Sequence, residues 1–545
     1  LQKGDVLNNI VTLENGSNAS SVYGGFTLQG NADGNKVTGS DSSISFAVYG
    51  GWGTTGASNN KVELDNVTVS GTVTAGKTDS GDASANTVIL SRGTTYSYDL
   101  YAGYTDDGDA ISNTLKLTDI SQEVYDIYSS YTGKGQAGGD VTLTNSHVDN
   151  VYGGKTEDGA ANGSTVKGTG DTTIGGNVYG GQGTTGASSN TVDLDNVKVS
   201  GKVRGGETTS GDVSGNKVFL SNKTTFTGDL YAGYTKDGNA TGNEVSLSDV
   251  SAPGNVYASY TAKGQAGGNS DETPSKVTIT KSSASGSVYG GYTASGTANY
   301  SSVAIIDSTL KNTGGDAVAS VYAGYTEKSG EASHNQVTVS GTTTTPTSIQ
   351  GSVYGGYTKS GTANNNSVTI NNNSTINSSV YAGFTKSGEA SYNKVTVSGS
   401  NASIQSEVYG GHGTHDSSYN IVELSEGAYA GDDVVGGHSA GGSSTSQNVI
   451  HNEVTVSSGS RVENGLYGGV ITEGRGTGTV QHNTVNLNNA SAGYEVVGGG
   501  VLLDAPTGTV ENNAVNISAG TVEGNVYGGA FHYFYGTGNS DIRNN

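Results

Sequence analysis

Short apolar patches alternate with polar residues along almost the whole chain, and the same three patches recur in the same order. The first patch reads Asn-x-Val-x-Leu, as at residues 60–64, and the second holds one or two aliphatic residues, such as Val67 and Val69. The third reads aliphatic-Tyr-small-Gly, as at residues 48–51. Because an apolar period of two puts every second side chain on one face of a strand, each repeat predicts three short strands.

The tyrosine of the third patch marks the position of each repeat. It recurs every 24–28 residues through most of the chain, and every 30–33 residues near 257–354 and after 435. A fixed period of this length is typical of solenoids. We therefore predict an all-β fold, a right-handed parallel β-helix (β-solenoid) of about nineteen coils of 24–33 residues with three strands per coil. The repeat positions are Tyr23, Tyr49, Thr74, Tyr101, Tyr128, Tyr152, Tyr179, Arg204, Tyr231, Tyr257, Tyr289, Tyr322, Tyr354, Tyr381, Tyr409, Val435, Tyr467, Val497 and Tyr527.

We predict one continuous β-solenoid over residues 1–545. Residues 1–400 form regular coils, and within them residues 23–151 resemble residues 152–288 at an offset of about 130 residues, which indicates a five-coil duplication. Residues 401–545 contain no lysine and have longer turns. No initiator methionine or signal peptide is recognisable, so we expect the chain to be a segment of a longer protein.

The third patch also predicts which side chains face inward. The residue before the tyrosine position is always Val, Leu or Ile and should face the core, whereas the tyrosine position also accepts Thr, Arg and Val and should face outward. The residue after it is always Gly, Ala or Ser, which indicates a tightly packed inward site. The next position is nearly always Gly, which indicates either a positive φ or a close approach between chain segments.

An asparagine lies two residues before the first inward valine in most coils. Stacked asparagines bond to nearby backbone and to one another between coils, as amide ladders do in cross-β assemblies. We therefore predict a structural asparagine column, and a sugar-binding row of asparagines is the alternative. Its regular members are Asn60, Asn86, Asn113, Asn190, Asn216, Asn243, Asn335, Asn366, Asn393 and Asn420.

Two aromatic columns are predicted on the outside of the coils, the tyrosine column itself and a second aromatic column three residues further along. One interpretation is a ladder of stacked rings that shields the sheet. The other is an aromatic strip that docks a glycan, a host protein or a neighbouring molecule, since tyrosine combines an apolar ring with a polar tip. The candidate interaction residues are Tyr49, Tyr101, Tyr104, Tyr231, Tyr234, Tyr289, Tyr292, Tyr322, Tyr325, Tyr354, Tyr357 and Tyr381.

Charge and cysteine content narrow the possible partners. The chain has 26 Lys and Arg against 49 Asp and Glu, a formal net charge of −23, which disfavours nucleic acids and anionic membranes. It has no cysteine, so neither disulfides nor thiolate chemistry are available. No apolar run approaches the roughly 20 residues that a membrane-spanning helix needs.

Catalytic and metal-binding patterns are sparse. Arginine is rare and the acidic residues are scattered through turns, so we predict no catalytic residues, no cofactor and no enzymatic activity. The one candidate metal cluster comprises His412, His415 and His438, because His412 and His438 occupy equivalent positions of successive coils. Substitution within the second aromatic column explains the same residues without a metal, and we predict no metal site.

The recurring pattern at residues 353–370, VYGGYTKSGTANNNSVTI, resembles the repeats in passenger regions of bacterial autotransporters and related large surface adhesins. The resemblance extends over essentially the whole chain. It implies a β-helical stalk that is exported and displayed at the outer membrane by a translocator barrel, which lies outside this segment. The expected location is therefore extracellular, at the bacterial cell surface.

Three function hypotheses follow from the repeats and this resemblance. The first is a non-catalytic structural and adhesive surface rod whose partners are a host surface, a glycan or another copy of itself. The second is a self-assembling extracellular filament or biofilm matrix subunit, which associates head to tail or laterally. The third is a polysaccharide-active enzyme built on a β-helix.

Overall fold

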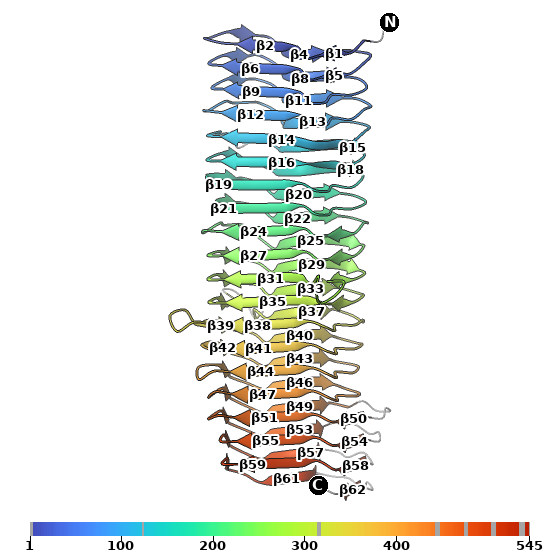
Figure 1. Cartoon of the computed structure of the whole chain (residues 1–545), viewed down its shortest axis with the longest axis vertical. Coiled ribbons are helices and arrows are strands. Elements are labelled where there is room, and N and C mark those ends of the chain that lie inside the picture. The colour runs from blue at the N-terminus through green and yellow to red at the C-terminus, as the bar shows by residue number, and fades with distance from the viewer. Residues whose placement is uncertain are drawn as a thin grey trace. The chain divides into compact units, whose positions relative to one another are not determined.

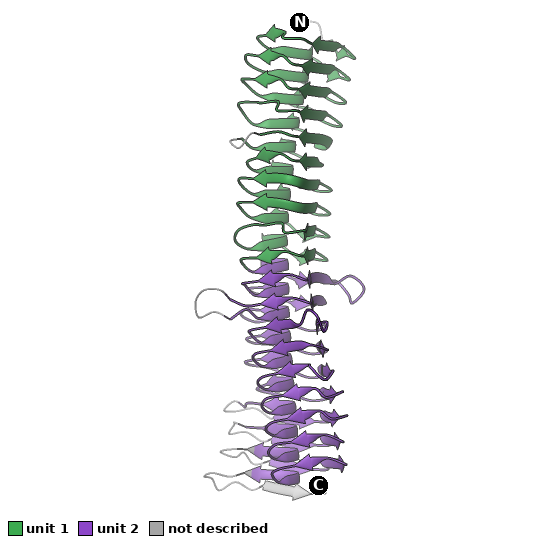
Figure 2. Cartoon of the chain, turned by 90° about the vertical axis from the view of Figure 1, so that its left-hand side faces the viewer, with its two compact units in different colours: residues 1–254 green, residues 255–545 purple. Residues whose placement is uncertain are grey.

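A computed structural model describes residues 4–121, 125–312, 318–441, 447–472, 478–502, 508–532 and 540–543. The described residues form strands and turns without any helix, and therefore include no helix that could cross a membrane. The strands are parallel and stack as a β-solenoid of about nineteen turns (Figure 1), which confirms the predicted fold class. The chain forms two compact units, residues 1–254 and 255–545 (Figure 2), and each is described by itself.

One coil of unit 1 illustrates how the three patches fold. The first patch forms β6 (Lys36–Ser40), the second forms β7 (Ser43–Ile44) and the third forms β8 (Val48–Gly53). In the next coil, β9 (Lys61–Asp65), β10 (Thr68–Val69) and β11 (Val73–Thr78) pair with them in parallel and in register. Each inward aliphatic side chain therefore lies directly over its counterpart one coil away, about 4.8 Å along the stack.

The third patch forms one strand in every coil, the marker strand. In unit 1 the remaining marker strands are β4 (Val22–Phe26), β13 (Leu100–Thr105), β15 (Ile127–Lys134), β18 (Val151–Asp158), β20 (Val178–Gly183), β22 (Val203–Thr208) and β25 (Leu230–Asp237). In unit 2 they are β29 (Val256–Lys263), β33 (Val288–Thr293), β37 (Val321–Thr326), β40 (Val353–Thr358), β43 (Val380–Thr385), β46 (Val408–Gly413), β49 (Val434–Ser439), β53 (Leu466–Ile471), β57 (Val496–Leu502) and β61 (Val526–His532).

The first patch forms a second set of stacked strands. In unit 1 these are, besides β6 and β9, β2 (Ile10–Leu13), β12 (Thr87–Ser91), β14 (Ala110–Thr118), β16 (Ala137–Thr144), β19 (Thr165–Ile174), β21 (Thr191–Val199), β24 (Lys217–Ser221) and β27 (Glu244–Ser248). In unit 2 they are β31 (Ser275–Thr280), β35 (Ser301–Ile306), β38 (Gln336–Ser340), β41 (Ser367–Asn371), β44 (Lys394–Ser398), β47 (Ile421–Ser425), β51 (Glu453–Ser457), β55 (Thr484–Asn488) and β59 (Ala514–Ser518). Some coils add a short fourth strand before this patch, such as β23 (Val213–Ser214) and β50 (Gln447–Ile450).

The core of each unit consists of aliphatic columns contributed by the three strands. Ile44, Val48 and Val62 are completely buried. Burying one such side chain contributes roughly 1.5–3 kcal/mol, so a run of identical coils accumulates stability although each coil is small.

The marker strand bends at its two small residues. The register of β8 with β11 links Tyr49 to Thr74 and Gly51 to Gly76 and omits the residue between them. As a result two consecutive residues face inward, and the ring of Trp52 returns to the outer face beside Tyr49, with ring centroids 4.9 Å apart. This bend is the physical reason that the two aromatic columns are three residues apart rather than two.

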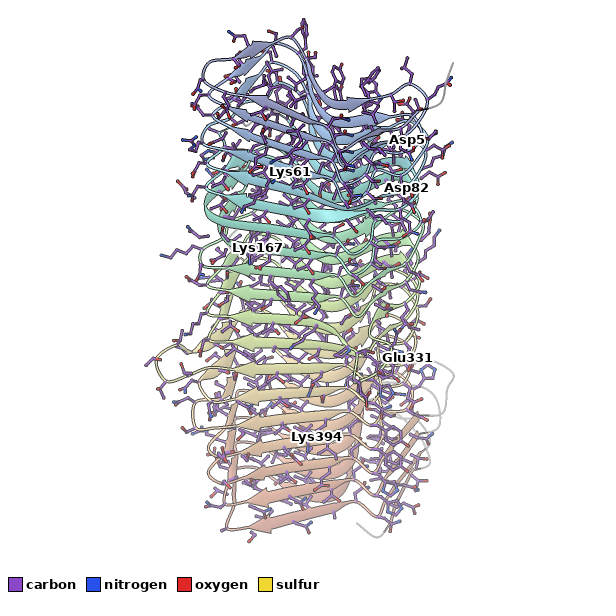
Figure 3. The ribbon with its side chains drawn as sticks, turned by 45° about the horizontal axis from the view of Figure 1, so that its top comes forward. Asp5, Lys61, Asp82, Lys167, Glu331 and Lys394 are labelled. Carbon is purple, nitrogen blue, oxygen red and sulfur yellow. The ribbon has the colours of Figure 1, made fainter. Side chains whose placement is uncertain are left out.

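Charged side chains lie on the outside of the coils and pair across neighbouring positions (Figure 3). Lys61 lies 2.9 Å from Glu63 in unit 1, and Lys394 lies 2.9 Å from Glu423 in unit 2. Exposed pairs of this kind contribute between zero and about 1 kcal/mol each. They keep the surface polar but do not determine the fold.

Candidate functional site

The asparagine column is a continuous buried hydrogen-bonded ladder within each run of asparagines. The Oδ1 atom of Asn60 accepts hydrogen bonds from the backbone N–H of Asn35 at 2.9 Å and from its Nδ2 at 3.2 Å. The Nδ2 of Asn60 donates to the carbonyl of Ala32 at 2.7 Å and to Oδ1 of Asn86 at 3.1 Å. Asn60 is 1% exposed, so its amide is satisfied entirely within the protein.

The same arrangement recurs wherever asparagines follow one another. All ten predicted members are buried, and unit 2 carries an unbroken run from Asn335 to Asn513. The run in unit 1 is interrupted after Asn113, whose Nδ2 donates to Ser130 instead of to another asparagine. Because these amides are enclosed, the structure gives a sugar no access to them.

The second small residue of each marker strand makes room for this ladder. A Cβ atom on Gly51 would lie 2.5 Å from Oδ1 of Asn60, closer than non-bonded atoms approach. The φ angles of these glycines lie outside the left-handed region, so close approach explains their identity and positive φ does not.

Where the marker strand carries Ser instead of Gly, the asparagine position changes with it. Ser130 faces Gly139, and Ser259 lies 2.7 Å from Ser275 between their Oγ atoms. In both coils a serine on the marker strand therefore faces a residue smaller than asparagine.

The tyrosine column is a stack of rings whose faces cover one another. In unit 2, Tyr289 and Tyr322 have centroids 5.1 Å apart and planes within 5°, and Tyr322 and Tyr354 have centroids 4.8 Å apart and planes within 1°. The second aromatic column meets the first edge to face, as at Tyr289 and Tyr292, with centroids 5.4 Å apart at 90°. None of the twelve predicted interaction tyrosines is fully exposed, and Tyr49, Tyr231 and Tyr357 are buried. Ring edges reach solvent, whereas ring faces in the continuous stretches are already occupied.

Tyrosine hydroxyls at the edge of the stack bond to carboxylates. The hydroxyl of Tyr128 donates to Asp126 at 2.9 Å, and the hydroxyl of Tyr467 donates to Glu495 at 2.9 Å. Burial and these carboxylates raise the pKa of Tyr128 and of Tyr467 above the ordinary range of tyrosine. Both phenols are therefore neutral donors at neutral pH.

Cations fill several positions where the columns of unit 1 lack an aromatic ring. The Nζ of Lys77 lies 4.5 Å from the ring centroid of Trp52. The guanidinium of Arg204 lies 4.5 Å from the centroid of Tyr234 and forms an ion pair with Glu207. Cation–π contacts contribute about 0.5–2 kcal/mol. At these positions a cation–π contact therefore replaces the contact between two aromatic rings.

Two of the three candidate metal ligands lie together and the third does not. The Nδ1 atoms of His412 and His438 are 3.1 Å apart, and Nε2 of His438 lies 2.7 Å from the hydroxyl of Thr472. Burial lowers the pKa of His438 to about 4 and lowers the pKa of His412 well below its usual value. His415 instead pairs with Thr414 in the following turn. Over the part of the chain that the structure describes, no group of three or more His, Cys, Asp or Glu side chains is arranged to hold a metal ion.

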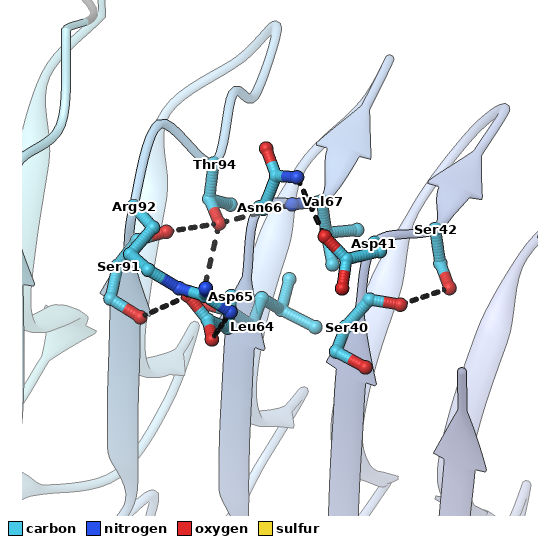
Figure 4. Close-up of polar contacts among 10 residues, drawn as sticks. All are labelled: Ser40, Asp41, Ser42, Leu64, Asp65, Asn66, Val67, Ser91, Arg92 and Thr94. Carbon is cyan, nitrogen blue, oxygen red and sulfur yellow. Dashed lines mark hydrogen bonds and ion pairs between the residues drawn. The ribbon is translucent and has the colours of Figure 1, made fainter. Parts of the chain in front are cut away.

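The turn after the first-patch strand carries a polar ladder of its own (Figure 4). Arg92 pairs with Asp65, and the Thr94 hydroxyl donates to the Ser91 carbonyl at 2.8 Å. The Arg92 hydrogen bond lowers the pKa of the Asp65 carboxyl. Arg92 is solvent-exposed, so we assign this corner to the surface of the solenoid and give it no ligand.

Sequence reasoning missed a group of exposed rings in unit 1. Phe46 and Tyr98 are 63% and 62% exposed, and they line one groove of about 790 Å³ together with Tyr125. Their signal in the sequence is an aromatic residue two positions before the marker aliphatic, which occurs at these three positions in unit 1 and at Tyr494 in unit 2. No family model, curated protein or solved structure matches this chain.

Proposed function

We propose that this chain is a non-catalytic, structural and adhesive β-solenoid displayed at a bacterial cell surface. The observation that carries the proposal is the buried asparagine ladder, which joins coil to coil by repeated hydrogen bonds, as at Asn366 and Asn393. Each such bond contributes about 0.5–1.5 kcal/mol net, and leaving its partners unpaired in the interior costs more. A ladder of this kind resists separation of neighbouring coils, which suits a protein that holds a binding surface away from a cell.

The partners that suit this role are a host surface, a glycan or a second copy of the chain. The excess of acidic residues, 49 against 26 basic ones, supports a neutral or cationic partner rather than a nucleic acid. The resemblance of the repeats to autotransporter passengers supports an extracellular location, with attachment to the membrane through a translocator outside this segment. The role requires neither a cofactor nor a reaction.

Display of the chain on the surface of a non-adherent bacterium, through an unrelated anchor, tests the adhesive role. We expect more cells to be retained under flow on host-cell monolayers or glycan-coated glass than with the anchor alone. Retention equal to that of the anchor alone on both surfaces would contradict the adhesive part of the proposal. Release of reducing sugar from polysaccharides by the purified chain would favour the enzyme hypothesis instead.

Electron microscopy of the purified chain separates the proposal from the filament hypothesis. Discrete particles at micromolar concentration are expected. Concentration-dependent filaments would indicate a matrix subunit.

A further inference from the structure

A short row of four residues, which includes three aromatic side chains, lies beside the tyrosine column of unit 1. Its position follows from the register of the marker strands. Val48, Val73, Leu100 and Ile127 lie in register across the marker strands β8, β11, β13 and β15. The residues two positions before them therefore lie in one row along the stack. That row is Phe46, Gly71, Tyr98 and Tyr125.

Two rings of this row are more exposed than any of the twelve candidate interaction tyrosines, none of which is fully exposed. Phe46 is 63% and Tyr98 62% exposed, and Tyr125 is half-buried. Tyr98 and Tyr125 stack with centroids 6.1 Å apart and planes at 29°. Large apolar side chains with this exposure add nothing to the core of the solenoid, so the fold does not account for them.

Gly71 leaves a gap in the row between Phe46 and Tyr98. These two residues are two coils apart, about 9.6 Å along the stack. A Cβ atom on Gly71 would collide with the backbone carbonyl of Phe46, so the packing of the two coils requires the gap. The result is a slot with an aromatic side chain at each end and backbone as its floor.

The groove that contains this slot has polar groups along its wall. Besides the three rings of the row it is lined by Tyr101 of the tyrosine column and by Ser45, Ser70, Thr72 and Asp99. The Asp99 carboxylate accepts a hydrogen bond from the Tyr101 hydroxyl at 3.3 Å and one from the backbone N–H of Asp126 at 3.2 Å. A carboxylate has about four acceptor positions, so Asp99 retains capacity for a ligand hydroxyl. The lining residues include no lysine or arginine, so an anionic ligand would meet only negative charge here.

We infer that this groove binds a neutral glycan, with one sugar ring in the slot between Phe46 and Tyr98. Ligand sites are mostly apolar and contain a few placed polar groups, which is the composition of this groove. The C–H faces of a sugar ring pack against aromatic rings, and its hydroxyls donate to Asp99 and to the serine and threonine oxygens. The inference rests on the proposed adhesive role and names the ligand class for it.

A quaternary ammonium ion is the competing ligand, because it also binds aromatic rings beside a carboxylate. Such an ion favours rings that surround one point. Phe46, Tyr98 and Tyr125 instead follow one another along the stack, with a repeat of about 4.8 Å per coil. A linear arrangement fits an extended chain of sugar units better than a compact cation.

Isothermal titration calorimetry of the purified full chain tests this inference. The probes are cellohexaose, N-acetylchitohexaose and maltohexaose, with choline chloride as the cationic probe. We expect at least one hexasaccharide to bind, and Tyr98→Ala and Phe46→Ala each to weaken it at least tenfold. The matched control is Tyr392→Ala in unit 2, whose ring is 54% exposed, and it should change binding less than twofold. Because all three side chains are exposed, the variants should keep the melting temperature of the parent chain.

Three outcomes overturn the inference: no hexasaccharide binds, only choline binds, or Tyr392→Ala weakens binding as much as Tyr98→Ala. The two proposals fail separately. A chain that retains cells on surfaces but binds none of the hexasaccharides contradicts the glycan site alone. A chain that binds a hexasaccharide through Tyr98 but retains no cells contradicts the adhesive role.

Discussion

The side-chain amide of Asn243 occupies the space beside Gly233 where a Cβ atom would lie. Such an atom would be 2.5 Å from Nδ2, 2.6 Å from Cγ and 2.8 Å from Oδ1 of Asn243. Gly233 belongs to a marker strand and Asn243 to the asparagine column, so the two most regular features of the sequence are one packing unit. Gly206 and Asn216 repeat this relationship one coil earlier.

Substitutions that enlarge Gly233 and shorten Asn243 test whether the two residues are energetically coupled. Gly233→Ser should destabilise unit 1 by about 1–3 kcal/mol through overpacking. Asn243→Gly should also destabilise it, because Asn216 loses the acceptor for its Nδ2 and backbone N–H. The double variant reproduces the natural pair Ser130 and Gly139, so its cost should be smaller than the sum of the single costs. Urea unfolding of all four proteins measures the coupling, and strictly additive costs would contradict it.

Most of the fold was predictable from the sequence, because the period of two and the repeat of the tyrosine directly indicate strands and coils. The asparagine column was also visible, since Asn366 and its counterparts recur two residues before an inward valine. Ring burial was not predictable, because it depends on how closely the rings stack face to face, as those of Tyr322 and Tyr354 do. The separation of His415 from His412 was missed because a spacing of three residues does not show that His415 lies beyond the end of β46, in the following turn.

The exposed groove was missed for a different reason. Its slot arises from a glycine, Gly71, between two aromatic residues that are far apart in sequence. Only the register of the marker strands brings Phe46 and Tyr98 onto one row.

Removal of one amide from the ladder should loosen unit 2 locally. Asn366→Leu leaves the backbone N–H of Asn335 and the Ala332 carbonyl without their partner, and Oδ1 of Asn393 keeps only its bond from the backbone N–H of residue 366. We expect a cost of about 2–5 kcal/mol, since each unpaired buried group costs about 1–3 kcal/mol. Hydrogen exchange should increase at backbone amides of β38, β41 and β44.

The control for this experiment is Asn401→Leu, because Asn401 is exposed and makes one side-chain bond to Asn373. It should change exchange little. Equal effects of the two substitutions would show that the ladder is not the source of the stability.

The histidine pair of unit 2 should make its stability depend on pH. The folded pKa of His438 is about 4, below the unfolded value of about 6.5. The unfolded state therefore binds more protons in this window. The contribution of His438 is constant above about pH 6.5 and falls by up to about 1.4 kcal/mol per pH unit toward pH 4.

Asp433 acts in the opposite direction and must be separated from this effect. Burial raises its pKa to about 6, so protonation of Asp433 favours the folded state as the pH falls from about 6 toward 4. The difference in unfolding free energy between the parent chain and His438→Gln isolates the histidine. A difference that does not change between pH 7 and pH 4.5 would contradict the assignment.

The ion pair of Arg204 and Glu207 should be replaceable by the tyrosines found in neighbouring coils. Both side chains are largely buried, and within the described part of unit 1 the Nε of Arg204 and Oε2 of Glu207 have no hydrogen-bond partner. Arg204→Tyr with Glu207→Tyr copies Tyr231 and Tyr234 and should stabilise unit 1 by about 1–4 kcal/mol. Glu207→Gln alone should destabilise it, because it leaves a buried charge unpaired. Thermal unfolding at pH 7 measures whether each variant is more or less stable than the parent chain. A loss of stability in the double variant would contradict the prediction.

The central claim is that recognition uses the exposed groove of unit 1, to which Tyr101 contributes, whereas the stacked tyrosines of unit 2 are structural. Retention under flow of cells that display the chain tests it most directly, with Phe46→Ala/Tyr98→Ala compared with Tyr322→Phe/Tyr354→Phe. The first variant should reduce retention on glycan-coated glass to the level of the anchor alone, and the second should leave it unchanged. Full retention by the groove variant, together with loss of retention by the ladder variant, would contradict the claim.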